Sequence, residues 1–168
     1  MENYGVDETI MLTRFFISGV IPMIALSGQS LSVAPSRTDL KTAGVFSVFI
    51  DSPQSKAPAA LQWEFSVPPA IAIAPSDIAI GKSAHSAGKS LTCAKKAAPA
   101  KQRAVNYTCI LAGGRQPIAN GPIAEVRYRA QWDVKGAPIK VAIENILGAS
   151  ADLKRISLPN VDAMIEVQ

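Results

Sequence analysis

Apolar and polar positions alternate with a period of two in short segments along most of the chain. In residues 60–67 (ALQWEFSV) every second side chain is large and apolar, which is typical of a strand with one buried and one solvated face. Residues 123–132 alternate in the same way. Both tryptophans, Trp63 and Trp132, fall on the apolar faces, so we expect them to pack in the core rather than to bind a ligand.

Similar segments recur about every dozen residues and are separated by Pro, Gly, Ser and Asn. Helical turns are allowed only at 83–89 and 145–153. Many short strands joined by turns predict an all-β fold, a β-sandwich of jelly-roll or immunoglobulin-like type with about nine strands. The segments are 31–34, 45–50, 60–67, 71–74, 77–80, 90–95, 104–111, 123–132, 139–146 and 161–167, with a short further strand possible at 156–158.

The N-terminus has the pattern of an export signal. Residues 15–26 form an apolar stretch that follows Arg14, is followed by small residues and is too short to span a membrane as a helix. The first ten residues are acidic, which does not fit a signal, but a start at Met11 gives a short basic segment. We therefore predict a signal peptide at 1–27 and one domain at 28–168, located outside the cytoplasm (secreted, periplasmic or cell-surface). The alternatives are a buried N-terminal element or a retained membrane anchor.

Composition narrows the function classes. The chain has 168 residues, 48% of them hydrophobic and 18% charged, which suits one globular domain. Its 12 prolines and 11 glycines exclude a helical bundle. One histidine and two cysteines nearly exclude zinc-ligand sets, so we expect no metal and no cofactor.

The two cysteines are expected to pair. Cys93 and Cys109 fall in adjacent predicted strands, and a symmetric turn near residues 100–101 places them opposite each other. In an exported protein such a pair is expected to be a disulfide; the alternative is two buried thiols. A catalytic cysteine would need a base, and the single candidate, His85, lies among small polar residues where we expect it to be solvated.

No motif indicates an enzyme. The Gly-Lys-Ser sequences at 81–83 and 88–90 lack the earlier glycine that a phosphate-binding loop requires. A glycosidase needs two carboxylates facing one cleft, and each acidic residue after the leader stands alone in the sequence. We therefore expect a binding protein.

The middle of the chain is basic. No Asp or Glu occurs at 78–124, and four cations are expected at the tip of the hairpin that contains the cysteines: Lys95, Lys96, Lys101 and Arg103. They either attract an anionic partner or protect a strand edge from pairing. Nucleic-acid binding is not expected, because the single aromatic residue of this segment, Tyr107, lies on the apolar face.

The order of the segments resembles that of cohesin domains and of the carbohydrate-binding modules that share their jelly-roll-like sandwich. The strand at 31–34 leads across a polar connector to 45–50, and 60–67 stands where cohesins have their third strand. Residues 121–128 (GPIAEVRY) resemble the family's strand that begins with glycine and ends in an aromatic residue, and the last two strands resemble its closing pair. The resemblance runs from about Leu31 to the C-terminus. It fails at Pro68-Pro69, where cohesins commonly have a Tyr-Asp-Pro-like turn.

This resemblance implies a non-catalytic module that docks a dockerin-type protein through a sheet face or, as the alternative, binds polysaccharide. Glycan platforms need exposed rings, but the aromatic residues fall on apolar faces, and Phe46 and Phe49 lie on opposite faces of one strand. Protein binding is therefore favoured. The expected surface is the polar face of the third strand with its neighbour: Gln62, Glu64, Ser66, Asn106 and Thr108.

Overall fold

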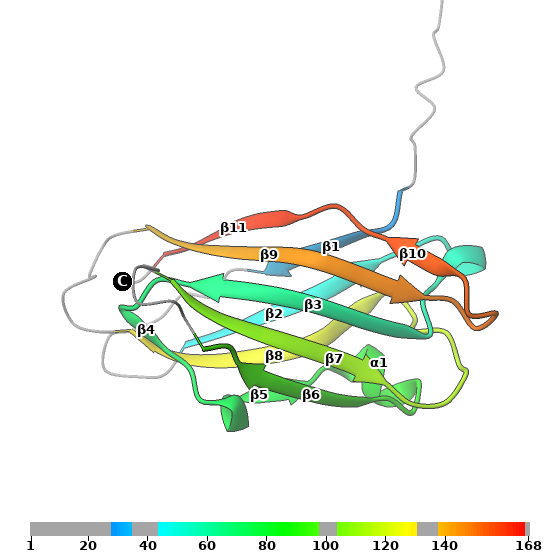
Figure 1. Cartoon of the computed structure of the whole chain (residues 1–168), viewed down its shortest axis with the longest axis horizontal. Coiled ribbons are helices and arrows are strands. Elements are labelled where there is room, and N and C mark those ends of the chain that lie inside the picture. The colour runs from blue at the N-terminus through cyan, green and yellow to red at the C-terminus, as the bar shows by residue number, and fades with distance from the viewer. Residues whose placement is uncertain (1–27, 35–43, 98–103, 131–137, 167–168) are drawn as a thin grey trace, which may run out of the picture.

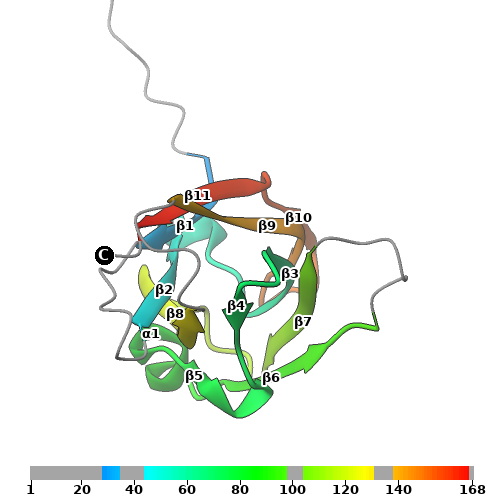
Figure 2. The same ribbon diagram turned by 90° about the vertical axis from the view of Figure 1, so that its left-hand side faces the viewer.

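The structure is a computed structural model that describes residues 28–34, 44–97, 104–130 and 138–166. These residues form two antiparallel β-sheets that pack face to face (Figures 1 and 2). The all-β sandwich predicted from the sequence is confirmed. The described residues contain eleven strands, more than the expected nine or so, and every strand expected within these ranges is present.

One sheet has five strands and forms the layer at the back of Figure 1. Four of them follow the order β1-β2-β8-β4, and β5 also pairs with β8. The bounds are β1 (Ser30–Ala34), β2 (Gly44–Asp51), β4 (Ile71–Ala72), β5 (Ile78–Ile80) and β8 (Gly121–Ala130).

The other sheet has six strands in the order β10-β9-β3-β7-β6, with β11 also pairing with β9. β3 lies between β9 and β7 and is therefore hydrogen-bonded on both sides. The bounds are β3 (Ala60–Val67), β6 (Ser90–Lys95), β7 (Val105–Ala112), β9 (Pro138–Ala149), β10 (Arg155–Ser157) and β11 (Val161–Glu166).

The helical segments are short: η1 (Gln54–Lys56), η2 (Pro75–Asp77) and α1 (Lys82–Ser86). α1 agrees with the helical turn expected at 83–89. It packs closely on β8, because a Cβ at Gly81 would lie 2.5 Å from the backbone carbonyl carbon and oxygen of Pro122. The helical turn considered at 145–153 is absent, since β9 continues to Ala149. The break in alternation there has another cause, a β-bulge described below. No helix in the described ranges is long and apolar enough to span a membrane.

The core lies between the sheets and is built from the alternating apolar positions. Trp63 is 0% exposed, as expected, and its indole N–H has no hydrogen-bond acceptor among the described residues. Phe65 stacks on Tyr107 with ring centroids 4.8 Å apart and meets Phe46 edge-on at 6.2 Å. The predicted packing of Trp63 is confirmed, whereas Trp132 lies outside the described residues, as does the predicted signal at 1–27.

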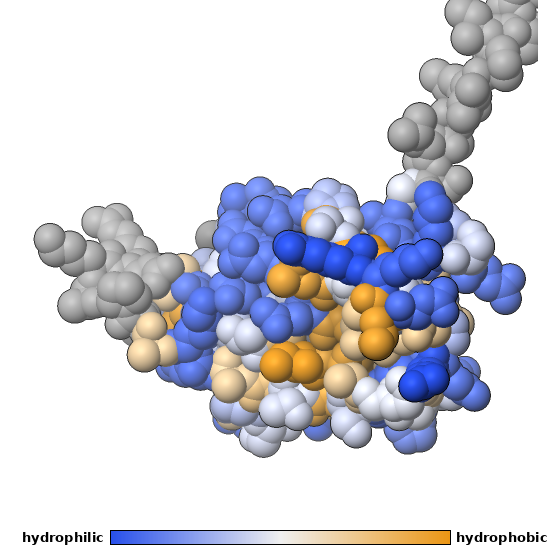
Figure 3. All heavy atoms as spheres, turned by 45° about the vertical axis from the view of Figure 1, so that its right-hand side comes forward, coloured by the Kyte–Doolittle hydropathy of each residue, from blue (hydrophilic) through white to orange (hydrophobic). Residues whose placement is uncertain are grey.

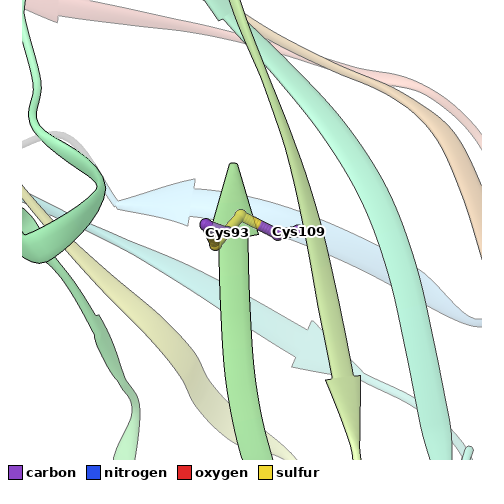
Figure 4. The surroundings of a disulfide bond; sticks show 2 residues. All are labelled: Cys93 and Cys109. Atoms are coloured by element: carbon purple, nitrogen blue, oxygen red, sulfur yellow. A yellow bond between two sulfur atoms is a disulfide. The ribbon is translucent and has the colours of Figure 1, made fainter. Parts of the chain in front are cut away.

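The cysteine pair is a disulfide. Cys93 in β6 and Cys109 in β7 are directly opposite each other, with their Cα atoms 4.1 Å apart (Figure 4). The expected pairing is therefore confirmed; the turn near 100–101 lies outside the described residues. Lys96 N–H donates to Asn106 O, which makes the cysteines a non-hydrogen-bonded pair, the closer of the two antiparallel arrangements. The bond ties the edge strand of this sheet to the strand beside β3.

Candidate docking face

The outward face of the six-stranded sheet carries the residues singled out from the sequence. The even-numbered residues of β3 (Gln62, Glu64 and Ser66) point outward and are partly exposed, while the odd-numbered ones are buried. On β7, Thr108 lies opposite Glu64 and Asn106 lies opposite Ser66. The structure thus brings all five residues onto one face, held by strands that are paired on both sides.

Two apolar side chains on this face were not singled out from the sequence. Ile110 and Leu147 are 48% and 37% exposed, and both lie opposite Gln62, one on each neighbouring strand. They form a cross-strand row with apolar ends and a polar centre. In Figure 3, apolar surface is gathered in the middle of the view and bordered by hydrophilic side chains. The sequence did contain a signal for Ile110. It is an even-numbered residue of β7, like Asn106 and Thr108, and even-numbered residues of this strand face outward.

Glu64 is the electrostatic centre of the face. Its Oε1 accepts a hydrogen bond from Lys96 Nζ at 2.7 Å, and its Oε2 accepts one from Asn145 Nδ2 at 3.1 Å. The hydrogen bond from Lys96 lowers the pKa of Glu64; partial burial opposes this, and hydrogen bonds from Asn145 and Thr108 reinforce it. The carboxylate is therefore charged at neutral pH and fixed in direction.

A β-bulge in β9 places Asn145 beside Glu64. The pairing of β9 with β3 shifts by one residue between Leu147 and Glu144, so that β9 contains one more residue than β3 over this stretch. Asn145 has φ 52°, a left-handed conformation that Asn tolerates better than most residues. Glu144 and Asn145 consequently both face outward. The signal in the sequence was two successive polar residues inside an alternating strand.

Comparison with solved structures identifies the architecture. The sixth cohesin of scaffoldin B from Acetivibrio cellulolyticus superposes with a TM-score of 0.67 at 10% identity, covering 84% of this chain and 99% of that one. A non-cellulosomal cohesin from Archaeoglobus fulgidus gives 0.63 at 8% identity (84% and 91%), and a cohesin module from Clostridium perfringens gives 0.63 at 9% (84% and 97%). The chain has the cohesin fold. No family model matches the sequence, and no curated protein matches it significantly.

Two carboxylates converge on the face of this cohesin-like sandwich. Glu144 lies directly opposite Glu64, an arrangement that the isolated positions of the acidic residues in the sequence did not indicate. They line a depression of about 230 Å³ together with Ser66 and Asn106. A carboxylic acid catalyst needs a raised pKa, and that of Glu64 is lowered. Glu64 is therefore held as a carboxylate and is not suited to act as the proton donor of such a pair.

The basic cluster expected at the hairpin tip is divided in the cohesin-like structure. Lys96 reaches Glu64 on the outer face, whereas Lys95 is paired with Tyr107 and shares the opposite, core-side phase. Lys101 and Arg103 lie outside the described residues. Among the described residues, Lys96 thus belongs to the candidate docking face and Lys95 does not.

Proposed function

We propose that this chain is an exported, non-catalytic, cohesin-type module that docks a protein partner through the outward face of its six-stranded sheet. The observation that carries the proposal is the row formed by Ile110, Gln62 and Leu147 beside the fixed carboxylate of Glu64. Exposed apolar groups next to oriented polar groups are typical of protein interfaces. Because the row lies on paired strands, little conformational freedom is lost on binding.

A dockerin-type domain is the partner class that we propose. The Acetivibrio cellulolyticus cohesin was solved in complex with a dockerin, and so was a Clostridium thermocellum cohesin that superposes with a TM-score of 0.64 at 10% identity. The dockerin complexes were observed for those two cohesins. They support the same partner class here because the fold is shared, while the side chains of the face decide which member of the class binds.

Polysaccharide binding remains the second candidate, and the aromatic residues disfavour it. Glycan platforms require planar rings in solvent, but five of the aromatic side chains are at most 2% exposed: Phe46, Trp63, Phe65, Tyr107 and Tyr128. Phe49 is half-buried and belongs to the other sheet. The candidate docking face carries none of these rings in an exposed position.

Export is part of the proposal. Disulfides persist in oxidising compartments, and the Cys93–Cys109 bond agrees with a location outside the cytoplasm. We propose that residues 1–27 are removed and that the mature chain of 28–168 begins between Gly28 and Leu31. N-terminal sequencing of the protein recovered from the medium or the cell surface tests this, and recovery of an intact start at Met1 or Met11 would contradict it.

The docking face is tested with purified dockerin domains and the mature module by calorimetry. At least one dockerin should bind, and Ile110→Asp and Leu147→Asp should each weaken it at least tenfold, because each places a charge in an apolar contact. Leu153→Asp is the matched control, since Leu153 is exposed in the turn between β9 and β10. Equal losses in all three variants, or binding of polysaccharides with no dockerin bound, would refute the proposal.

A further inference from the structure

A second hollow lies beside β4, the short strand labelled at the left of Figure 1. Its volume is about 330 Å³, and it is lined by residues of both sheets. Such a volume lies at the lower end of the range for small-ligand sites, roughly 300–1,000 Å³. The residues that matter for its chemistry are Ile73, Asp77, Lys95, Val105, Tyr107 and Arg129.

Two cations reach this hollow from opposing sheets. Lys95 is the last residue of β6 and lies on the same face of the strand as Leu91 and Cys93, the face toward the core. Arg129 comes from β8, where it is paired with Ala72 of β4. Both side chains are exposed, and neither forms an ion pair with any described residue. Their charges are available to a ligand.

The remaining polar groups of the hollow are already engaged. Asp77 Oδ2 accepts a hydrogen bond from the Ala74 backbone N–H at 3.1 Å, at the start of η2. The Tyr107 hydroxyl donates to Ile73 O at 2.7 Å, and burial, followed by the charge of Asp77, raises the pKa of this phenol. Tyr107 is therefore neutral at physiological pH. The floor of the hollow is a satisfied hydroxyl surrounded by apolar groups.

We propose that this hollow binds the carboxy-terminal residue of a peptide, with its carboxylate at Lys95 and Arg129 and an apolar side chain against Ile73 and Val105. Two cations and one engaged carboxylate leave a net positive charge that suits a monoanion. A uronic acid is disfavoured because its hydroxyls would face apolar walls without partners. The site is separate from the candidate docking face, so it does not depend on the proposed function.

The test is an NMR titration of the ¹⁵N-labelled mature module with the acetylated tripeptide Ala-Ala-Leu bearing a free carboxylate. Shifts should concentrate in the backbone amides around Ile73, Lys95 and Val105. The carboxamide form of the tripeptide should bind at least tenfold more weakly. Lys95→Gln and Arg129→Gln should each reduce affinity about fivefold, as expected for one exposed charge contact. Arg127→Gln is the matched control, because Arg127 is exposed on the same strand but does not line the hollow.

Several outcomes would overturn the assignment. Equal affinity for the free-acid and carboxamide tripeptides would show that the carboxylate is not recognised. A loss of affinity in Arg127→Gln equal to that in Arg129→Gln would show nonspecific electrostatic attraction. Binding of galacturonate in preference to the tripeptide would assign the hollow to acidic sugars, and absence of shifts at millimolar tripeptide would show no site. Ile110→Asp should leave tripeptide binding unchanged, which separates this result from a failure of the docking proposal.

Discussion

Removal of the Cys93–Cys109 disulfide should destabilise the domain by about 3 kcal/mol. The two cysteines are 16 residues apart, and the chain-entropy relation for a loop of that length gives an entropy loss in the unfolded state equivalent to about 3 kcal/mol at 25 °C. The bond also anchors β6, whose hydrogen-bonded pairing within the described residues is with β7 alone. For a domain of this size the corresponding fall in melting temperature is about 10 °C.

The assay is urea unfolding of the double variant Cys93→Ala/Cys109→Ala beside the oxidised and reduced parent. Reduction should reproduce the loss measured for the double variant, and the variant should be insensitive to reductant. A parent whose stability does not change on reduction, or a double variant as stable as the oxidised parent, would refute the reasoning. Under reducing conditions neither the parent nor Cys93→Ala has the cross-link. If Cys93→Ala is then still less stable than the reduced parent, the loss reflects the packing of the Cys93 side chain rather than the cross-link.

Three further expectations concern the core and the face. Trp63→Ala should cost about 3–5 kcal/mol in denaturant unfolding, whereas Trp63→Phe should cost clearly less because the indole N–H has no acceptor to lose; equal losses would contradict this. Gly81→Ala should cost about 1–3 kcal/mol in thermal unfolding, since its Cβ would meet the Pro122 backbone at 2.5 Å; an unchanged melting temperature would show that α1 can move. The pKa of Glu64 is lowered in the folded state from its ordinary value of 4.5. Its interactions therefore stabilise the fold fully at pH values above 4.5, and this contribution is lost as the pH falls through the lowered folded-state pKa. Glu64→Gln should therefore flatten the pH dependence of unfolding below pH 4.5, by less than about 1 kcal/mol because Lys96 is exposed; an unaltered profile would contradict the pairing.

The sequence was most informative where alternation was strict. The period of two in β3 assigns Trp63 to the core and Glu64 to the surface without any knowledge of neighbours. The disulfide could also be predicted, because a symmetric hairpin places Cys93 opposite Cys109 by counting alone. These inferences are local, and each needs only one strand or one turn.

Partners across the sheet could not be predicted in the same way. Glu64 meets Glu144 and Asn145 because β9, some 80 residues later, pairs with β3, and alternation does not reveal which strands become neighbours. Proximity in sequence places Lys96 in a basic cluster at the hairpin tip, whereas in the structure its ammonium group forms an ion pair with Glu64. The hollow near β4 depends on contacts between two sheets and has no sequence signature.

The extra residue in β9 has a consequence for how this protein can change in length. Within a paired strand, losing one residue normally turns every following side chain over. Asn145 is different, because it opposes no partner of its own: without it, Ile146 would still point inward and Leu147 outward. β9 can thus shorten at this position and keep both its buried row and its exposed leucine. Such a deletion would remove the amide that orients Glu64, and so would change the proposed docking face while the packing between the two sheets is kept.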